Sequence, residues 1–336
     1  MKSVVCTQPG EMEVRDIERP QDRAGQVIVK IKRIGVCGTD IHAFGGNQPF
    51  FQYPRVLGHE LSGVIDSIGE GVNLEVGQEV YIVPYMSCGQ CIACRNAKSN
   101  CCSNIQVLGV HVDGGMCEYL QVPAEYVIKT DGIPLDQLAV VECLAIGAHA
   151  VRRSEIKVDT DVLVVGAGPI GMGIAQFAKE KGARVIVMDT NQERLDFCKN
   201  TLKLDAVVQA GEGATEALAE LTNNEFILTV FDATGNPKAM EAGFKWVAHG
   251  GRYVLVSVVK SDISFSDPEF HKREMTLMGS RNATHEDFAH VVSCLRNGSV
   301  IAESMITHRG ALLDLPTLLP EWSKSESGVI KALIEV

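Results

Sequence analysis

The stretch CGQCIACRNAKSNCC, which begins at residue 88, contains five of the eleven cysteines of the 336-residue chain. Four of them have the spacing C-x2-C-x2-C-x7-C, and they are Cys88, Cys91, Cys94 and Cys102. Four thiolates on one loop can surround a structural zinc ion tetrahedrally, and four thiolates also suit an iron–sulfur cluster. The odd cysteine count disfavours a disulfide framework. Cys101 is left over, although its place beside Cys102 allows the two to exchange roles.

A second set of metal-binding residue types is spread over three segments. The segments are GVCGTDIH with Cys37, Thr39, Asp40 and His42, LGHE with His59 and Glu60, and VEC with Glu142. Cysteine, histidine and carboxylate are the ligand types of a catalytic zinc, which keeps one position open for water or substrate. The pattern indicates a site only as a set, because spacing along the chain does not show that the three segments meet.

A glycine-rich motif indicates a dinucleotide site. The segment GAGPIG fits the pattern G-x-G-x-x-G through Gly166, Gly168, Pro169, Ile170 and Gly171. It follows the apolar run DVLVV, which predicts a buried strand, and it opens an amphipathic segment that predicts a helix. The first glycine allows a tight turn, the second lets the pyrophosphate approach, and the third permits close helix–strand packing. The free N–H groups of the helix would then bind the phosphates.

Asp189, at the end of the next expected strand, indicates which dinucleotide is bound. An acidic residue at this point accepts hydrogen bonds from the adenosine ribose hydroxyls. The following Thr190 and Asn191 are not cationic, and the nearest cation, Arg194, lies a helical turn away. A 2′-phosphate would meet a carboxylate here, so NAD is favoured over NADP, with Arg194 as a further cofactor-binding candidate.

Two kinds of sequence pattern divide the chain. Up to about residue 145, short apolar runs broken by glycine predict β-strands. From Asp161 onward, apolar runs alternate with amphipathic segments, which predicts βαβ units and a parallel sheet. The segment GVIKALIEV predicts a strand that returns to the first part.

Composition restricts the function classes. Hydrophobic residues make up 46% and charged residues 22%, as in a globular protein with a core, and the net charge is −11. Such an acidic chain lacks the basic surface that binds nucleic acid or an anionic membrane. No apolar run is long enough to span a membrane, and the first residues lack the apolar segment of a secretory signal. We therefore expect a cytoplasmic protein with reduced thiols and a small-molecule substrate.

Several motifs together resemble the zinc-dependent medium-chain dehydrogenases over essentially the full length of the chain. They are GVCGTDIH, YPRVLGHE, the four-cysteine loop, GAGPIG with Asp189, and FDATGNP. The resemblance implies an α/β protein with a GroES-like β-barrel catalytic domain, formed by residues 1–146 and 290–336 and holding both zinc sites. It also implies a Rossmann domain with a doubly wound parallel sheet, formed by residues 147–289 and binding NAD.

Within this family the chain is similar to the polyol and sugar-acid branch, which includes sorbitol, L-threonine and L-galactonate dehydrogenases. Glu142 stands where other alcohol dehydrogenases of the family carry a cysteine. GGNQPFFQYPRVLGHE, GVHVDGG and FSDPEFHKREMTLMGSRNATHEDFA resemble the L-galactonate enzymes beyond the shared motifs. The branch usually has Glu-Pro where this chain has Glu142–Cys143. The resemblance implies hydride transfer between NAD and a secondary alcohol of a polyol or sugar acid, with an L-galactonate-type hexonate favoured, by a homodimer or homotetramer.

The resemblance also implies two zinc ions per chain and assigns their ligands. The structural zinc would be held by the four-cysteine loop. The catalytic zinc would be held by Cys37, His59 and a carboxylate, for which Glu60 and Glu142 compete. One carboxylate of this branch binds directly, while the other acts through water or replaces substrate during turnover.

Roles in catalysis follow from the same resemblance. Asp40 is similar to the carboxylate that orients the zinc-bound histidine, here His59. Thr39 would take the proton of the substrate hydroxyl and pass it through the cofactor ribose to His42 and solvent.

The substrate carboxylate of a sugar acid needs a cation. Arg281, in GSRNAT, suits bidentate carboxylate binding, although a structural or cofactor-contacting arginine is equally compatible. His111 and Phe51 are further pocket candidates. Alternative functions are a sorbitol-, L-threonine- or butanediol-type alcohol dehydrogenase, a zinc-free NADPH-linked quinone reductase, and a regulatory nucleotide-binding protein without turnover.

Overall fold

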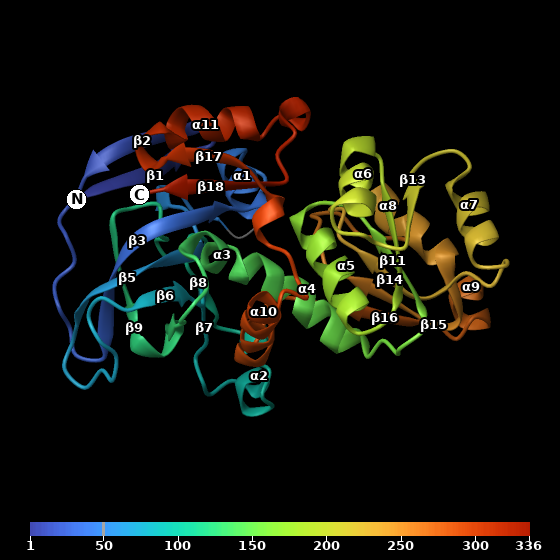
Figure 1. Cartoon of the computed structure of the whole chain (residues 1–336), viewed down its shortest axis with the longest axis horizontal. Coiled ribbons are helices and arrows are strands. Elements are labelled where there is room, and N and C mark those ends of the chain that lie inside the picture. Colours follow the sequence, from blue (N-terminus) through green and yellow to red (C-terminus); the bar gives the residue numbers. More distant parts are fainter. Residues whose placement is uncertain (49–50) are drawn as a thin grey trace. The chain divides into compact units, whose positions relative to one another are not determined.

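The structure, a computed structural model, describes residues 1–48 and 51–336, so Pro49 and Phe50 of the GGNQPFFQYPRVLGHE segment lie outside the description (Figure 1). The chain forms two compact units. Unit 1 consists of Met1–Glu142 and Ala302–Val336, and unit 2 consists of Cys143–Ile301.

Unit 1 is built mainly from antiparallel strands, as the glycine-broken apolar runs predict. A seven-stranded sheet has the order β10-β6-β5-β3-β18-β17, with β9 also paired to β3, and a smaller sheet has the order β2-β1-β4. The strands of the two sheets are β1 Lys2–Gln8, β2 Glu11–Asp16, β3 Gln26–Val36, β4 Arg55–Val56, β5 Glu60–Ile68, β6 Glu79–Ile82, β9 Tyr119–Pro123, β10 Val127–Lys129, β17 Ile306–Ala311 and β18 Lys331–Glu335. A strand pair and four helices complete the unit, namely β7 Tyr85–Met86, β8 Gln106–Val107, α1 Gly38–Phe44, α2 Ile92–Arg95, α3 Leu135–Ala139 and α11 Leu315–Trp322.

The strand β3 organises this sheet. Val27, Ile28 and Val29 are buried in succession at its start, and Val27, Val29 and Ile31 belong to the core of unit 1. It pairs with β5 on one side and, through Ala332 opposite Val36, with the C-terminal strand β18 on the other. The predicted return of GVIKALIEV to the first part of the chain is therefore observed.

Unit 2 contains a six-stranded parallel sheet with the order β13-β12-β11-β14-β15-β16. This is the doubly wound order, in which the first strand lies near the centre and the chain winds outward in both directions. The strands are β11 Asp161–Val165, β12 Arg184–Asp189, β13 Ala206–Gln209, β14 Ile227–Asp232, β15 Val247–Leu255 and β16 Thr276–Gly279. The helices are α4 Val141–Ser154, which begins in unit 1, α5 Pro169–Glu180, α6 Gln192–Asn200, α7 Ala214–Leu221, α8 Pro237–Gly243, α9 Asp267–Lys272 and α10 His285–Asn297.

The observed division differs from the predicted boundaries. A boundary between residues 289 and 290 would cut α10, whereas the whole of α10 lies in unit 2. The reason is that its apolar stripe, which includes Phe288 and Val291, is buried as one face. The first boundary falls after Glu142 instead of after residue 146, so α4 begins in unit 1 and continues into unit 2.

A buried carboxylate holds the start of α10 against α4. Asp287 is only 1% exposed and accepts hydrogen bonds from Arg152 Nε at 2.6 Å and from the Thr284 backbone at 2.8 Å. The Nδ1 atom of His149 lies 2.8 Å from the Oδ2 atom of Asp287. Burial alone would raise the pKa of Asp287, but the hydrogen bonds from His149 and Arg152 outweigh it and hold the pKa well below its usual range.

Replacing Asp287 with asparagine tests this contact. At pH 7 we expect the free energy of unfolding to fall by roughly 1–3 kcal/mol, the cost of leaving buried hydrogen-bonding groups unsatisfied. Because the folded-state pKa is lowered, the contribution of Asp287 is complete above its unfolded pKa of about 3.9 and is lost as the pH falls through the folded value. Urea unfolding followed by circular dichroism at pH 7 and at successively lower pH measures the difference.

Asp161→Asn is the matched control, because Asp161 forms an exposed ion pair with Arg184 in the same unit. Its expected cost is below about 1 kcal/mol. A difference between the wild type and Asp287→Asn that grows toward acid pH would contradict the assignment.

Candidate metal centres and dinucleotide site

Three of the predicted ligands of the catalytic metal meet in unit 1. The ligand atoms of Cys37, His59 and Glu60 all lie within 4.8 Å of one another. Strand pairing explains how they meet, because Gly35 of β3 lies opposite Glu60 of β5, and Cys37 directly follows β3 as the N-cap of α1. Gly35 is required here, since a Cβ at this position would lie 2.1 Å from Glu60 Oε2.

Asp40 fixes the two backbone segments that carry Cys37 and His59. Its carboxylate, 1% exposed, accepts hydrogen bonds from Cys37 N at 2.9 Å and from Gly58 N at 3.1 Å. The distance from Asp40 Oδ1 to His59 Nδ1 is 3.8 Å, which is too long for a direct hydrogen bond. Asp40 therefore acts on the imidazole through its charge and through the backbone N–H of Gly58, the residue before His59.

The charges and donors of this cluster fit a divalent cation. Burial favours neutral His59, but the neighbouring Cys37 and Asp40 outweigh burial and hold the pKa of His59 well above its usual value. Among the described residues, none forms a hydrogen bond with the buried His59 Nδ1. A thiol, an imidazole and buried carboxylates together are the donor set of a zinc site, and buried acidic groups need a compensating positive charge.

Two residues that the sequence analysis missed hold the competing carboxylates. Lys331 of β18, 2% exposed, donates to both oxygens of Glu60 at 2.6 and 2.8 Å and to Val36 O at 3.2 Å. Tyr85 of β7 donates its hydroxyl hydrogen bond to Glu142 Oε1. Burial, followed by the charge of Glu142, raises the pKa of Tyr85 well above its usual value, so the phenol remains a donor. The sequence signal for Lys331 is a lysine that directly precedes the apolar run ALI in KALIE.

Glu142 belongs to the same buried region, although it is not in the group of three ligand atoms. It is 5% exposed in the first turn of α4, and its charge contributes to the raised pKa of His59. Burial raises the pKa of Glu142 itself. The neighbouring Cys143 is buried and lies outside the group of ligand atoms.

The predicted proton relay residues lie on α1. Thr39 and His42 are three positions apart, so they share one face of this helix directly after Cys37. Thr39 is half-buried and His42 is exposed. This is the order that proton transfer from a buried point to solvent requires, and the relay itself stays a prediction.

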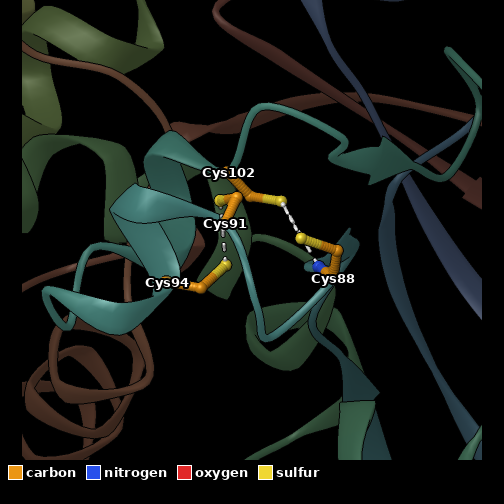
Figure 2. Close-up of side chains that lie close together, drawn as sticks. All are labelled: Cys88, Cys91, Cys94 and Cys102. Atoms are coloured by element: carbon orange, nitrogen blue, oxygen red, sulfur yellow. Dashed lines mark hydrogen bonds between the residues drawn. The ribbon is translucent and has the colours of Figure 1, made fainter.

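The four-cysteine loop brings its predicted sulfur ligands together (Figure 2). The Sγ atoms of Cys91 and Cys94 are 3.5 Å apart, and those of Cys88 and Cys102 are 3.4 Å apart. Zn–S bonds of about 2.3 Å in a tetrahedron place sulfur atoms about 3.8 Å apart, so small movements complete the site. Cys102 is buried within the group, whereas Cys101 is exposed and outside it.

Backbone hydrogen bonds prepare this loop for a cation. Those from Cys94 and Ser103 lower the pKa of Cys91 to about 5, and those from Gln90 and Cys91 lower the pKa of Cys88, whereas burial raises the pKa of Cys94 to about 11. Thiolates are the metal-binding form of cysteine. The loop therefore fits a metal ion chemically as well as geometrically.

The glycine motif forms the turn between β11 and α5. Gly166 has φ +101°, and a Cβ on Gly171 would lie 1.8 Å from Gly166 O, so both positions require glycine. Nothing lies within 4 Å of the Cβ position of Gly168, the N-cap of α5, which leaves room for a phosphate. Pro169 and Ile170 form the first turn of α5 behind it.

Asp189 ends β12 beside this turn. Its carboxylate accepts hydrogen bonds from Ala167 N at 2.5 Å and from Asn191 N at 2.7 Å. Arg194 lies on α6, where its backbone N donates to Asn191 Oδ1 at 3.0 Å. The structure thus places the predicted acidic residue at the glycine turn, as a dinucleotide site requires.

The substrate candidates have other observed contacts. His111 Nδ1 accepts a hydrogen bond from Val107 N at 3.1 Å. Phe51 packs edge-on against Tyr53, with the ring centroids 4.7 Å apart. Arg281 is exposed in unit 2, just after β16. Contact with a substrate stays a prediction for all three.

Comparison with known proteins agrees with this geometry. Residues 23–133 match the alcohol dehydrogenase GroES-like domain, and residues 169–297 match the zinc-binding dehydrogenase domain. The chain belongs to the zinc-binding dehydrogenase family. The predicted family and the predicted fold, a GroES-like unit with a Rossmann unit, are therefore confirmed.

Relatives of this dehydrogenase include several polyol and sugar-acid enzymes. L-galactonate-5-dehydrogenase of Escherichia coli K12 is 46% identical over 310 residues, which cover 92% of this chain and 91% of the relative. Sorbitol dehydrogenase of Halalkalibacterium halodurans is 32% identical over 334 residues, which cover 97% and 95%. The crystal structure of the alcohol dehydrogenase rspB from E. coli CFT073, complexed with NADH, has a TM-score of 0.94 at 30% identity. The match covers 100% of this chain and 99% of the rspB chain.

Among the described residues, no helix is long and apolar enough to cross a membrane.

Serine substitutions in the loop test which thiols hold metal. We expect Cys94→Ser to lose one metal ion per chain, because one thiolate of the tetrahedral set is removed. Cys101→Ser is the matched control and should keep its metal, since this exposed thiol lies outside the set. Metal content of the purified full-length proteins by plasma mass spectrometry measures both, and loss of metal from Cys101→Ser but not from Cys94→Ser would reverse the assignment.

Proposed function

We propose that this dehydrogenase oxidises a secondary alcohol of a sugar acid, a hexonate of the L-galactonate type, with NAD and zinc. The observation that carries the proposal is the group of half-buried Cys37 and buried His59 and Glu60, which offers thiol, imidazole and carboxylate donors within 4.8 Å. The 46% identity to L-galactonate-5-dehydrogenase supports the substrate class.

Two zinc ions per chain are part of this proposal. Cys37, His59 and Glu60 would hold the catalytic ion, and the four-cysteine loop would hold the structural one. A zinc ion held by these residues would supply Lewis-acid chemistry and lower the pKa of a hydroxyl beside them. The donor chemistry of the loop also suits iron, and the family match to zinc-binding dehydrogenases supports zinc.

The residues around the metal have separate tasks. Asp40 holds the backbone segments that carry Cys37 and His59, and Lys331 balances the charge of Glu60. Thr39 accepts the substrate proton and His42 delivers it to solvent. Hydride transfer requires direct contact between the donor and acceptor carbons, so water must be excluded from between them.

NAD is supported over NADP by the environment of Asp189. A carboxylate at this position suits ribose hydroxyls and repels a 2′-phosphate. Arg194 lies on α6, the helix that follows Asp189, and is a further candidate for contact with the cofactor. The rspB relative is complexed with NADH, although a related Sinorhizobium meliloti structure at 26% identity and TM-score 0.91 is bound to NADP.

Other features of the proposal follow from the substrate. A hexonate carboxylate requires a cation, and Arg281 has the planar guanidinium that binds it in bidentate fashion. A polyol would not require this contact, so sorbitol, the substrate named for a 32% identical relative, is the second candidate. The buried ligand group disfavours a zinc-free quinone reductase. We further propose a cytoplasmic homodimer or homotetramer without nucleic-acid or membrane partners.

A substrate screen tests the proposed activity. NAD reduction should be faster with L-galactonate than with sorbitol, L-threonine or 2,3-butanediol, and slower when NADP replaces NAD. Cys37→Ser should lower kcat/KM at least about 100-fold, because Lewis-acid stabilisation is worth several kcal/mol and each 1.36 kcal/mol is tenfold. Its retained NADH binding, measured by fluorescence, is the control for folding. If the protein reduces NAD with none of the secondary alcohols, the proposed function is refuted.

Matched amide substitutions distinguish the two carboxylates. Glu60→Gln should lose the catalytic zinc, because Glu60 belongs to the group of ligand atoms, whereas Glu142→Gln should keep it and still accept the hydrogen bond from Tyr85. Metal content and Cd²⁺ substitution followed by absorption spectroscopy compare the variants. Loss of the metal from Glu142→Gln alone would make Glu142 the direct ligand.

A further inference from the structure

Unit 2 contains another group of metal-binding side chains, separate from those assigned above. Glu180 is the last residue of α5, and His290 and Cys294 lie on α10. Their ligand atoms all lie within 4.8 Å of one another. None of the three has a role in the dinucleotide turn or in either zinc site of unit 1.

Helix geometry explains how the group forms. His290 and Cys294 are four positions apart, so they project from one face of α10 a single turn apart. Phe177 of α5, almost one turn before Glu180, contacts the His290 ring with centroids 5.6 Å apart. This contact holds the end of α5 beside α10 and brings the Glu180 carboxylate to the imidazole.

The distances match a tetrahedral metal. Bond lengths of about 2.3 Å to sulfur, 2.05 Å to nitrogen and 2.1 Å to oxygen place S and N about 3.6 Å apart, and N and O about 3.4 Å apart. The observed distances are 3.7 Å from Cys294 Sγ to His290 Nε2 and 3.5 Å from His290 Nε2 to Glu180 Oε2. His290 Nδ1 lies 3.9 Å from the same sulfur, so the ring lies alongside the thiol, and a turn about its soft χ2 torsion directs one nitrogen to a shared ion.

We propose that Glu180, His290 and Cys294 bind a divalent transition-metal ion of the zinc class, with the fourth position occupied by water. Thiolate, imidazole and carboxylate donors together select such an ion over calcium or magnesium, which prefer oxygen alone. Binding replaces the thiol proton of Cys294, which leaves to solvent. The His290 side chain is 33% exposed, so the ion enters from solvent.

One neighbouring cation opposes binding. Lys181 Nζ lies 4.0 Å from Glu180 Oε2, and its side chain is half exposed. The ammonium can therefore turn into solvent when an ion takes the carboxylate, at little energetic cost. The opposing charge weakens binding at this site.

The ion would join two helices with known tasks in unit 2. The N-terminus of α5 forms the glycine turn, and the first turn of α10 holds α4 through Asp287. An ion at the other end of α5 cross-links these helices without touching the reacting groups. Its expected effect is stabilisation of the folded protein by mass action, and not a change in the chemical step.

Metal titration of the full-length protein tests the site, independently of the proposed function. The protein, with its resident metals in place, is equilibrated with increasing free Zn²⁺ set by a chelator buffer, and bound zinc and melting temperature are measured. The wild type should bind one more zinc ion per chain than His290→Gln and Cys294→Ser, and only the wild type should gain thermal stability. Glu180→Gln should weaken binding by more than the roughly 10–100-fold cost of losing an outer-shell partner.

Cys198→Ser is the matched control, because Cys198 is another fully buried cysteine of unit 2 outside the group. It should bind the same number of zinc ions as the wild type. If Cys294→Ser fails to fold, His290→Gln decides the question alone, because the His290 side chain is partly exposed. The dehydrogenase activity of His290→Gln should equal that of the wild type. Equal zinc uptake and equal thermal shifts in the wild type and His290→Gln would overturn the proposal.

Discussion

The buried ion pair between Glu60 and Lys331 holds the metal-ligand region of unit 1 together. Glu60 begins β5, Lys331 begins β18, and the same ammonium also binds the last carbonyl of β3. Removing either partner would leave an uncompensated charge in the interior, where a lone ion is very costly. The three strands must therefore keep their register, and this register sets the positions of Cys37 and His59.

The same electrostatic constraint explains the surroundings of the site. Asp40 and Glu142 are additional buried acids, and each is held by specific donors, backbone N–H groups for Asp40 and the Tyr85 hydroxyl for Glu142. So many acidic groups around one imidazole favour a bound cation over an empty cluster. Unit 2 satisfies a different requirement, since its glycine turn leaves backbone N–H groups and open space for a phosphate.

Local motifs could be predicted from the sequence, and long-range partners could not. The glycine turn, the four-cysteine loop and the strand–helix alternation depend on residues close together in the chain, and the structure places them as expected. Lys331 lies 271 positions from Glu60, and Tyr85 lies 57 positions from Glu142, so only the folded sheet reveals these pairs. The predicted boundary near residue 290 differs from the observed division because the buried stripe of α10 continues past it. Cys102 is buried and Cys101 is exposed, a difference that spacing does not report.

The discontinuous make-up of unit 1 has a consequence for biosynthesis. All of unit 2, through Ile301, is translated before the ribosome reaches the segment that carries β18. The usual order, in which the N-terminal domain folds first, is therefore unsuited to this chain. Until translation has passed unit 2, β3 lacks its neighbour β18, and Glu60 lacks the Lys331 ammonium. The nascent protein would contain all residues of unit 2 before the acidic residues around His59 gain Lys331. Metal binding at that site would then be a late step of maturation.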